Sequence, residues 1–299
     1  MSYHKPVLLH QCIELLNIDP NGIYVDVTFG GGGHSAAILE RLELGRLYAF
    51  DQDPDAAENT MEDERFTLIK ANFRYLRKML RLHGVTRING LLADFGISSH
   101  QIDQPERGFS LRHEGPLDMR MNPSLTQDGA SVINGYSVQD LTRILRDYGE
   151  LRQARRVATE IINKRPLHST GELKGAVGHL APKKTPARFW AQVFQAIRIE
   201  VNQELTAIYE LLEQATDLLL PGGRLVCLSY HSLEDRPVKN FFRYGNVEGK
   251  PEKDFYGNLL RPLTPVNRKP ITADTEELKE NPRARSAKLR AAEKIEATE

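Results

Sequence analysis

Four consecutive glycines, Gly30 to Gly33, stand where an apolar segment of the chain meets an amphipathic one. Residues 23–29 are mostly β-branched or aromatic, and residues 35–44 carry apolar side chains at helical spacing. The order of strand, glycine loop and helix brings backbone N–H groups close to a nucleotide-like ligand, because glycine turns tightly and has no Cβ in the way. The sequence therefore predicts a nucleoside cofactor near the N-terminus.

An acidic residue follows this loop at the spacing that suits ribose binding. Asp51 ends the predicted strand 46–51, about 20 positions beyond the glycines, where a carboxylate accepts hydrogen bonds from ribose hydroxyls. Both NAD and S-adenosylmethionine carry such a ribose. Acidic residues at strand ends are also often helix caps, and Asp53 before Pro54 fits that plainer interpretation.

The loop and two further carboxylates favour the methyl donor over the dinucleotide. The string GGGGHS supplies the first two glycines of a dinucleotide fingerprint, but Ser35 replaces the third, which such a site uses for close packing of helix on sheet. Asp26 and Asp94 are predicted at the carboxyl edge of the sheet. A pyrophosphate gains nothing from nearby carboxylates, whereas the ammonium group of S-adenosylmethionine needs acceptors.

Strand and helix patterns alternate over the N-terminal third of the chain, which predicts a parallel sheet with right-handed crossovers. The predicted strands are 23–29, 46–51, 66–70 and 88–94, and the predicted helices are 35–44, 54–61 and 73–83. The next strand, 224–229, follows the turn Pro221-Gly222-Gly223, although a crossover needs only roughly a dozen residues. Beyond it, 233–244 is predicted to be helical and 245–270 to be a loop or hairpin.

Helical signals fill most of the gap before that strand. They are Ser137 with Asp140 before a helix at 138–148, Ser169 with Glu172 before one at 173–180, and Thr185 with Pro186 before a third. An apolar stripe at helical spacing then comprises Phe194, Ile197, Val201, Leu205 and Ile208. Residues 103–192 are therefore predicted to be a helical insertion in an α/β domain formed by residues 1–102 and 193–299.

The composition excludes several classes of protein. The chain has 299 residues with 40 basic and 40 acidic side chains, so a site for a polyanion must come from local clustering. Its two cysteines, Cys12 and Cys227, cannot form a disulfide framework or a four-thiolate zinc site; Cys227 is expected in the core, and no metal is expected. Since no apolar run reaches membrane-spanning length and the first residues lack a signal-peptide pattern, we expect a cytoplasmic protein without a membrane partner.

Several longer strings are distinctive as a set and run from one end of the chain to the other. They are HKPVLL (4–9), DVTFGGGGHS (26–35), DQDP (51–54), DFGISSHQ (94–101), RGFS (107–110), GPLDMRMN (115–122), FQAIRIEVNQEL (194–205), GGRL (222–225), SYHSLEDRPVK (229–239) and NPRARSAKLR (281–290). In this order they resemble the small-subunit rRNA (cytosine-N4)-methyltransferases, known as the MraW or RsmH family. The resemblance implies a class I (Rossmann-like) S-adenosylmethionine-dependent methyltransferase fold with an inserted helical domain. It also implies N4-methylation of a cytosine in the decoding centre of 16S rRNA, with 16S rRNA or the small ribosomal subunit as partner.

The resemblance implies a set of cofactor residues when it is carried over position by position. These are Gly32, Gly33 and His34 in the loop, Asp51 on the ribose, Phe73 on the adenine, and Asp94 and Gln101 completing the pocket. Gly30 and Gly31 are then expected mainly to make the turn. Without the resemblance, Phe73 would be interpreted as a core residue at a helix start after Asn72.

The catalytic group stays open between two candidates. Many amino-methyltransferases hold the amine with a D/N/S-P-P-Y/F motif after strand four, but this chain has Asp94-Phe95-Gly96-Ile97 there. Asp94 could still orient the amine, although the resemblance implies cofactor binding. His231 follows strand 224–229, and an imidazole suits proton transfer near neutral pH. Alternatively His231 only begins the next helix, with Glu234 and Asp235 near its positive end.

Basic side chains in the predicted insertion would have to hold the RNA. Beside aromatic residues they suit phosphate contact and base stacking, although for each one alone a solvated helix face is the preferred explanation. The RNA-binding candidates are Arg155, Arg156, Lys183, Lys184, Arg188, Trp190, Arg198 and Asn202. Two rival functions remain: a nicotinamide-dependent oxidoreductase, which Ser35 disfavours, and a non-catalytic RNA-binding assembly factor, which would not need an intact donor pocket.

Overall fold

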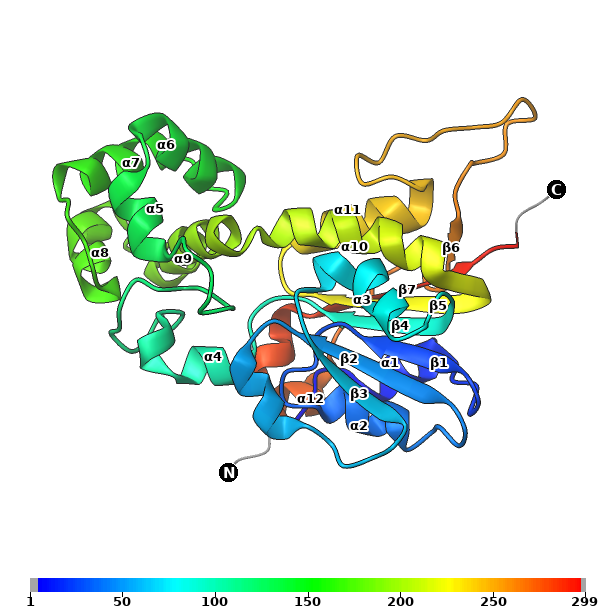
Figure 1. Cartoon of the computed structure of the whole chain (residues 1–299). Coiled ribbons are helices and arrows are strands. Elements are labelled where there is room, and N and C mark those ends of the chain that lie inside the picture. The colour runs from blue at the N-terminus through cyan, green and yellow to red at the C-terminus, as the bar shows by residue number, and fades with distance from the viewer. Residues whose placement is uncertain (1–4, 297–299) are drawn as a thin grey trace. The chain divides into compact units, whose positions relative to one another are not determined.

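The computed structural model describes residues 5–296 of the chain. Within them the chain divides into two compact units, one made of the residues up to Gly96 and from Leu205 onward, the other of Ile97–Glu204. The first is an α/β unit and the second is helical (Figure 1). The predicted insertion, 103–192, lies inside the second unit, which starts before it and ends after it.

A seven-stranded sheet forms the centre of the first unit, in the order β3-β2-β1-β4-β5-β7-β6. Its strands are β1 (Ile23–Asp26), β2 (Arg46–Asp51), β3 (Phe66–Lys70), β4 (Ile88–Asp94), β5 (Leu219–Ser229), β6 (Leu263–Pro265) and β7 (Lys288–Lys294). The first five are parallel, whereas β7 is antiparallel to β5 and β6. The predicted α/β class is confirmed. Asp51, Asp26 and Asp94 end the neighbouring strands β2, β1 and β4, where the strand order reverses and where ligands of such folds bind.

Helices cover both faces of this sheet, and alternate side chains of each strand enter the two cores (Figure 1). One face carries α3 (Leu76–Leu82), α10 (Glu204–Leu218) and α11 (Ser232–Tyr244); the other carries α1 (Leu9–Leu16), α2 (Gly33–Leu39) and α12 (Thr275–Glu280). In β5, Cys227 enters the first core, as expected, while Val226 and Leu228 enter the second. Within residues 5–296, no helix has both the length and the apolar character needed to cross a membrane.

The turn predicted at residues 221–223 is a bulge inside β5. Ile88 pairs with Leu219 and Gly90 with Arg224, so β5 advances five positions (219 to 224) where β4 advances two (88 to 90). The extra residues include Gly222, whose φ is 77°. β5 therefore begins before the predicted start at 224, because the pairing resumes on both sides of the glycines.

The second unit packs its helices around a core of its own. They are α4 (Ser99–Asp103), α5 (Gly129–Gly135), α6 (Val138–Asp147), α7 (Ala154–Asn163), α8 (Thr170–Val177) and α9 (Pro186–Asn202). The helix-start signals hold in part. Ser137 caps α6, and Ser169 with Glu172 forms a complete capping box on α8. Thr185 is the N-cap of α9 by position, but its side chain makes no capping hydrogen bond.

The apolar stripe predicted as one helix is shared by two. Gln203 adopts a left-handed φ of 51° and separates α9 from α10. Val201 belongs to the core of the second unit, whereas Leu205 and Ile208 belong to the first. The spacing continues across the break because each helix buries its own apolar face.

Other boundaries differ from the sequence prediction. β1 stops at Asp26 rather than residue 29, and α2 at Leu39 rather than residue 44. The segments Pro54–Asn59 and Phe73–Tyr75 are 3₁₀ turns, as are Pro105–Arg107, Gly178–Leu180 and Pro282–Ser286. The sequence analysis did not predict α1, α12 or β7. In β7 the basic Lys288 and Arg290 alternate with apolar residues, which conceals a short strand in a charged tail.

Candidate functional site

The glycine loop leaves β1 and leads into α2. Gly30 and Gly32 have φ values of 50° and 76°, in the left-handed region that favours glycine. A Cβ on Gly33 would lie 2.2 Å from Cγ of Pro6, so the packing of the N-terminal segment also requires glycine there. A Cβ on Gly31 would meet nothing within 4 Å. The positive φ angles therefore fall at Gly30 and Gly32, rather than at the expected pair Gly30 and Gly31.

Ser35 has a structural reason to occupy the position of the third dinucleotide glycine. Its hydroxyl donates to Asp26 Oδ2 at 2.7 Å, and the Thr28 N–H donates to Oδ1 at 3.0 Å. Asp26 and Ser35 are 1% and 0% exposed. Burial raises the pKa of Asp26. Asp26 therefore fastens the loop to the first turn of α2, which differs from the predicted ligand-facing acceptor.

Asp51 holds the loop from the neighbouring strand. Its Oδ2 accepts the Gly30 N–H and its Oδ1 accepts the Asp53 N–H, both at 2.8 Å. Burial raises the pKa of Asp51 to about 6, against these hydrogen bonds. Each carboxylate oxygen keeps further acceptor capacity. Asp53 caps the turn Pro54–Asn59 through the Asp55 N–H, which confirms the plainer interpretation of that residue.

Asp94 lies between a loop residue and a tyrosine. The Tyr230 hydroxyl donates to Asp94 Oδ1 at 2.7 Å, and His34 Nδ1 lies 3.9 Å from Oδ2. His34 is itself fixed, because its Nε2 is 3.0 Å from the Val7 carbonyl. Burial raises the pKa of Asp94 to about 6, although His34 and Tyr230 act in the opposite direction. Asp94 thus has one oxygen bonded to Tyr230 and the other beside an imidazole, at the edge of the sheet. Such a carboxylate can accept a hydrogen bond from an ammonium group or from an amine.

The remaining predicted cofactor residues have local roles as well. Phe73 is half-buried at the start of its 3₁₀ turn, after the Asn72 cap, with its ring centroid 6.2 Å from that of Phe95. The core interpretation and an adenine platform are both compatible with this placement. Gln101 is 4% exposed and belongs to the second unit, where it completes a capping box with Ser98.

His231 and Glu234 form a pair at the end of β5. His231 is the N-cap of α11 by position, but its ring makes no capping hydrogen bond. Instead its Nε2 lies 3.0 Å from Glu234 Oε1, and the other Glu234 oxygen accepts the Tyr230 N–H at 2.7 Å. Glu234 is fully buried. The helix-start interpretation of His231 is right about its position, and the pairing adds a carboxylate that can orient an imidazole.

The neighbouring Asp235 is engaged elsewhere. Its carboxylate receives Nε and Nη2 of Arg290 at 2.6 and 3.2 Å, and Lys288 lies 3.5 Å away. Burial acts to raise the pKa of Asp235, but these cations hold it below its usual value. The basic residues of β7 therefore form a structural ion pair with α11. Within residues 5–296, no cluster of His, Cys, Asp and Glu is arranged to hold a metal ion.

A comparison with known families shows which family this chain belongs to. The model described as the MraW methylase family matches residues 1–295. The chain belongs to that family. Its glycine loop and strand-end carboxylates are thus those of a methylase with a Rossmann-like α/β fold.

Individual relatives match over their whole length. The ribosomal RNA small subunit methyltransferase H of Flavobacterium johnsoniae is 53% identical over 299 residues, covering 99% of both chains. The protein of the same name from Cytophaga hutchinsonii is 54% identical over 297 residues, covering 98% of this chain and 99% of that one. A solved rRNA methylase from Streptococcus thermophilus is much more distant, with 14% identity and a TM-score of 0.44 over 98% of each chain.

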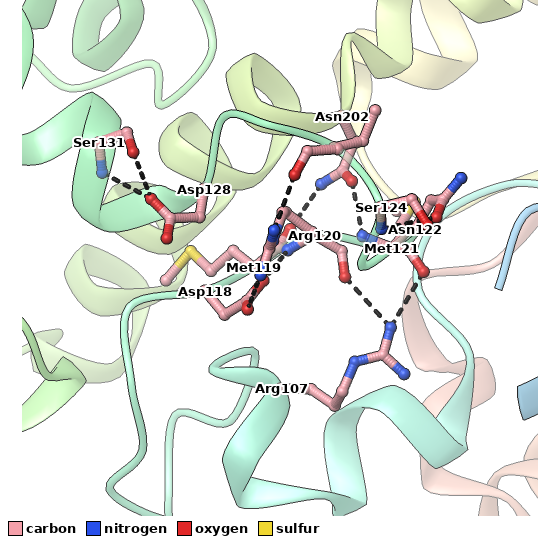
Figure 2. A network of polar contacts seen from close by, with 11 residues as sticks. Arg107, Asp118, Met119, Arg120, Met121, Asn122, Ser124, Asp128, Ser131 and Asn202 are labelled. Atoms are coloured by element: carbon pink, nitrogen blue, oxygen red, sulfur yellow. Dashed lines mark hydrogen bonds and ion pairs between the residues drawn. The ribbon is translucent and has the colours of Figure 1, made fainter. Parts of the chain in front are cut away.

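The MraW-type motif 115–122 forms a tightly bonded loop in the second unit (Figure 2). Asp118 and Arg120 make a bidentate ion pair at 2.7 and 2.8 Å, and Arg107 Nη2 donates to the carbonyls of Arg120 and Met121 at 3.1 and 2.9 Å. Met119 adopts a φ of 59°, which is unusual for a residue with a side chain. The loop is therefore held by a dense polar network.

Two of the RNA-binding candidates belong to this internal network. Asn202 is 5% exposed; its amide accepts the Met121 N–H and donates to the Met119 carbonyl, both at 2.7 Å (Figure 2). Arg198 makes a bidentate ion pair with Glu204 at 2.8 and 2.9 Å. The structure thus disfavours Asn202 as an RNA contact, because the C-terminal turn of α9 uses it to hold the loop. Arg198 is likewise engaged within the unit.

The other basic candidates lie on the surface of the second unit. Arg155 and Arg156 are exposed on α7, where they line a shallow hollow, and Lys183, Lys184 and Arg188 are exposed around the start of α9. Trp190 is half-buried and packs edge-to-face on the buried Phe189, with ring centroids 5.1 Å apart. Phe189 belongs to the core of the second unit, and Trp190 packs against that core.

The sequence analysis missed Tyr230 and treated Glu234 only as a charge near a helix end. Both lie in the string SYHSLEDRPVK, which carried the family resemblance. The spacing of His231 and Glu234 by three residues at a helix start was the available signal, because such positions share one side of the first turn.

Proposed function

We propose that this chain transfers the methyl group of S-adenosylmethionine to N4 of a cytosine in the decoding centre of 16S rRNA. The observation that carries the proposal is the whole-length identity of 53–54% to proteins named ribosomal RNA small subunit methyltransferase H. Family membership as a methylase and the loop-and-carboxylate geometry support the same donor. The cytosine and its N4 position come from the motif resemblance.

The proposed donor site uses the carboxyl edge of the sheet. Asp51 would accept the ribose hydroxyls, Asp94 the ammonium group, and Phe73 would pack on the adenine. Gly32, Gly33 and His34 would line the loop side, and Gln101 is included on the strength of its motif. These residue types match a zwitterionic nucleoside, because two carboxylates accept its hydroxyl and ammonium protons while loop N–H groups suit its carboxylate.

The chain must overcome the weak nucleophilicity of cytosine N4, whose lone pair is delocalised into the ring. Alignment of the amine with the donor methyl can supply roughly 7–11 kcal/mol in favourable systems. A general base adds about 10²–10⁴-fold. We assign proton acceptance to His231, since its ring is paired with a buried carboxylate, and a positioning role toward the donor to Asp94.

The direct test is transfer of tritiated methyl from S-adenosylmethionine to small subunits and to free 16S rRNA, both from a strain lacking the enzyme. Nucleoside mass spectrometry of the product is expected to show N4-methylcytidine. Methyl on another atom would refute the N4 assignment, and no incorporation into either RNA would refute the methyltransferase proposal. Calorimetry with S-adenosylmethionine and NAD should show binding of the former alone.

A substitution tests the proposed base. His231→Ala is expected to lower the single-turnover rate by roughly 10²-fold or more, while the affinity for S-adenosylmethionine is unchanged, because the ring lies on the proton path and not on the donor. The matched control is His10→Ala, on the exposed face of α1. Full activity of the His231 variant would remove this residue from the mechanism.

A further inference from the structure

We propose that Glu234 is the positioning residue for His231, and that it fixes the tautomer in which the imidazole can accept the amine proton. The inference rests on the proposed function and goes beyond it, because it assigns a role to a buried carboxylate one helical turn away from the candidate base. It also gives a reason for the contacts of residues 230–234, which lie between the candidate base and Asp94 on the donor side.

A continuous set of polar contacts links the two sides of the site. His231 Nε2 lies 3.0 Å from Glu234 Oε1, and Glu234 Oε2 accepts the Tyr230 N–H at 2.7 Å. The hydroxyl of the same Tyr230 donates to Asp94 Oδ1 at 2.7 Å. Because Tyr230 is bonded through both its backbone and its side chain, a displacement of Glu234 would disturb the base directly and Asp94 through Tyr230.

Capping of the helix alone does not account for Glu234. In a capping box, the N-cap side chain bonds the N3 backbone while the N3 carboxylate bonds the N-cap N–H. Here the N-cap His231 makes no such bond, and the N3 Glu234 reaches past it to Tyr230. Its second oxygen lies 3.0 Å from Nε2 of the imidazole. A fully buried carboxylate is costly, so its retention beside a histidine indicates a use for its charge.

The neighbouring charges leave this pairing intact. Asp235, the next acidic residue, is neutralised by Arg290 and Lys288 from β7. Asp94 faces Tyr230 and His34. Glu234 thus holds a carboxylate oxygen 3.0 Å from Nε2 of His231. The proposal places the ring proton on this nitrogen, and a neutral imidazole protonated at Nε2 carries its lone pair on Nδ1.

The proton balance follows from this tautomer. The N4 nitrogen forms a bond to the methyl carbon as the carbon–sulfur bond breaks, and the sulfur keeps that electron pair. One N4 proton passes to Nδ1 of His231, which becomes an imidazolium paired with the Glu234 carboxylate. The products are N4-methylcytosine and the neutral thioether of the donor, and the imidazolium then releases its proton to water.

Glu234→Gln tests this role with little change of shape. The Tyr230 N–H can only donate, so the glutamine oxygen must stay on that side, and the amide NH₂ then faces His231. An NH₂ group donates to Nε2, which forces the ring proton onto Nδ1, the nitrogen that should accept. We expect the tautomer to reverse, and the single-turnover rate to fall at least about tenfold, as part of the 10²–10⁴-fold that a positioned base contributes.

Three measurements separate positioning from a merely structural role. Imidazole ¹⁵N shifts, assigned with a His231→Gln variant, should show Nε2–H in the parent protein and Nδ1–H in Glu234→Gln. Calorimetry should give an affinity for S-adenosylmethionine within about twofold of the parent. The control is Glu293→Gln, which removes a carboxylate paired with Arg224 at 2.7 Å in the middle of β5, and it should change neither tautomer nor rate.

Each outcome is decisive. An unchanged tautomer with an unchanged rate in Glu234→Gln overturns the proposal, as does a rate loss without tautomer reversal, which would mark a structural role. If Glu234→Gln does not fold, the parent protein still decides, because an Nδ1–H tautomer there contradicts the assignment. Absence of methyl transfer by the parent protein would instead defeat the proposed function, while the tautomer measurement, made without donor or RNA, would stand independently.

Discussion

Asp51 and Asp94, at the ends of two strands on either side of β1, show how the surroundings of a residue decide its chemistry. Asp51 and Asp94 both have a pKa raised to about 6 by burial. Asp26, between them in the sheet, is buried more completely and is used to fasten Ser35. Three aspartates, each the last residue of its strand, therefore divide into two candidate ligand acceptors and one structural group.

The raised pKa values predict a pH dependence of donor binding. A cationic ammonium and ribose hydroxyls need ionised acceptors, and each carboxylate with a pKa near 6 loses its charge as the pH falls through that value. Between pH 7.5 and pH 5, we expect the affinity for S-adenosylmethionine to fall by about tenfold for each carboxylate that must be ionised. Calorimetry across this range should show a weaker slope for Asp94→Asn, and a flat profile in the parent protein would contradict the assignment.

Ser35→Ala tests the contact between the loop and α2. The substitution removes the hydroxyl that donates to Asp26 at 2.7 Å in a fully buried setting. We expect a loss of about 1–3 kcal/mol in the free energy of unfolding, the usual cost of a buried group left without its partner. Urea unfolding followed by far-UV circular dichroism measures it. Ser124→Ala, at an exposed position, should stay within about 0.5 kcal/mol of the parent protein.

At the scale of elements, short polar segments are held by side chains distant in sequence. The loop around Met119, which has a left-handed backbone, is held by Asn202 from the end of α9, whose amide bonds the Met119 carbonyl and the Met121 N–H (Figure 2). The helix break at Gln203 comes directly after this residue. The conformation of the loop and the end of α9 therefore depend on the same hydrogen bonds, which join segments distant in sequence.

Asn202→Ala should destabilise the second unit. It leaves the Met121 N–H and the Met119 carbonyl without their Asn202 hydrogen bonds, so we expect a loss of about 2–6 kcal/mol in the free energy of unfolding, from two groups at about 1–3 kcal/mol each. The single tryptophan, Trp190, packs against the core of this unit, so its fluorescence reports this unfolding. Asn163→Ala, at the exposed end of α7, is the control. A shift as small as that of the control would mean that the loop does not depend on the amide.

At the scale of the whole molecule, the chain carries no net charge yet exposes basic side chains in the second unit. A neutral protein can still bind a polyanion where local charge is concentrated. Arg155, Arg156, Lys183 and Lys184 are exposed, in contrast to Arg198 and Asn202 with their internal partners. The RNA proposal therefore rests on the first four together with Arg188.

Replacing these four exposed side chains by glutamine tests the RNA-binding surface. Each lost phosphate contact should reduce the slope of log affinity against log salt by about 0.7–0.9, so we expect a total reduction of up to about 3.6 if all four side chains contact phosphates. Filter binding of 16S rRNA fragments at several salt concentrations measures it, and donor affinity should not change. The control exchanges Lys78 and Arg81, exposed on α3 of the first unit. An equal effect of the control would indicate nonspecific attraction.

Much of the first unit follows from local sequence. The strands at 46–51, 66–70 and 88–94 have the predicted bounds, because short apolar runs between turn signals are local properties. The glycine loop and Asp51 are predictable for the same reason. β7 was not, because its pairing partner β5 lies more than fifty residues away and its basic side chains dominate the pattern.

The sequence by itself determined the family, the order of loop and strand-end carboxylates, and the presence of helical signals between β4 and β5. Only the tertiary structure decided which of those polar groups have internal partners. It assigned Asp26 to Ser35 and Asn202 to the Met119 loop, and it paired His231 with Glu234. The physical reason is that hydrogen-bond partners and burial depend on contacts between distant segments, whereas residue type and spacing are written along the chain.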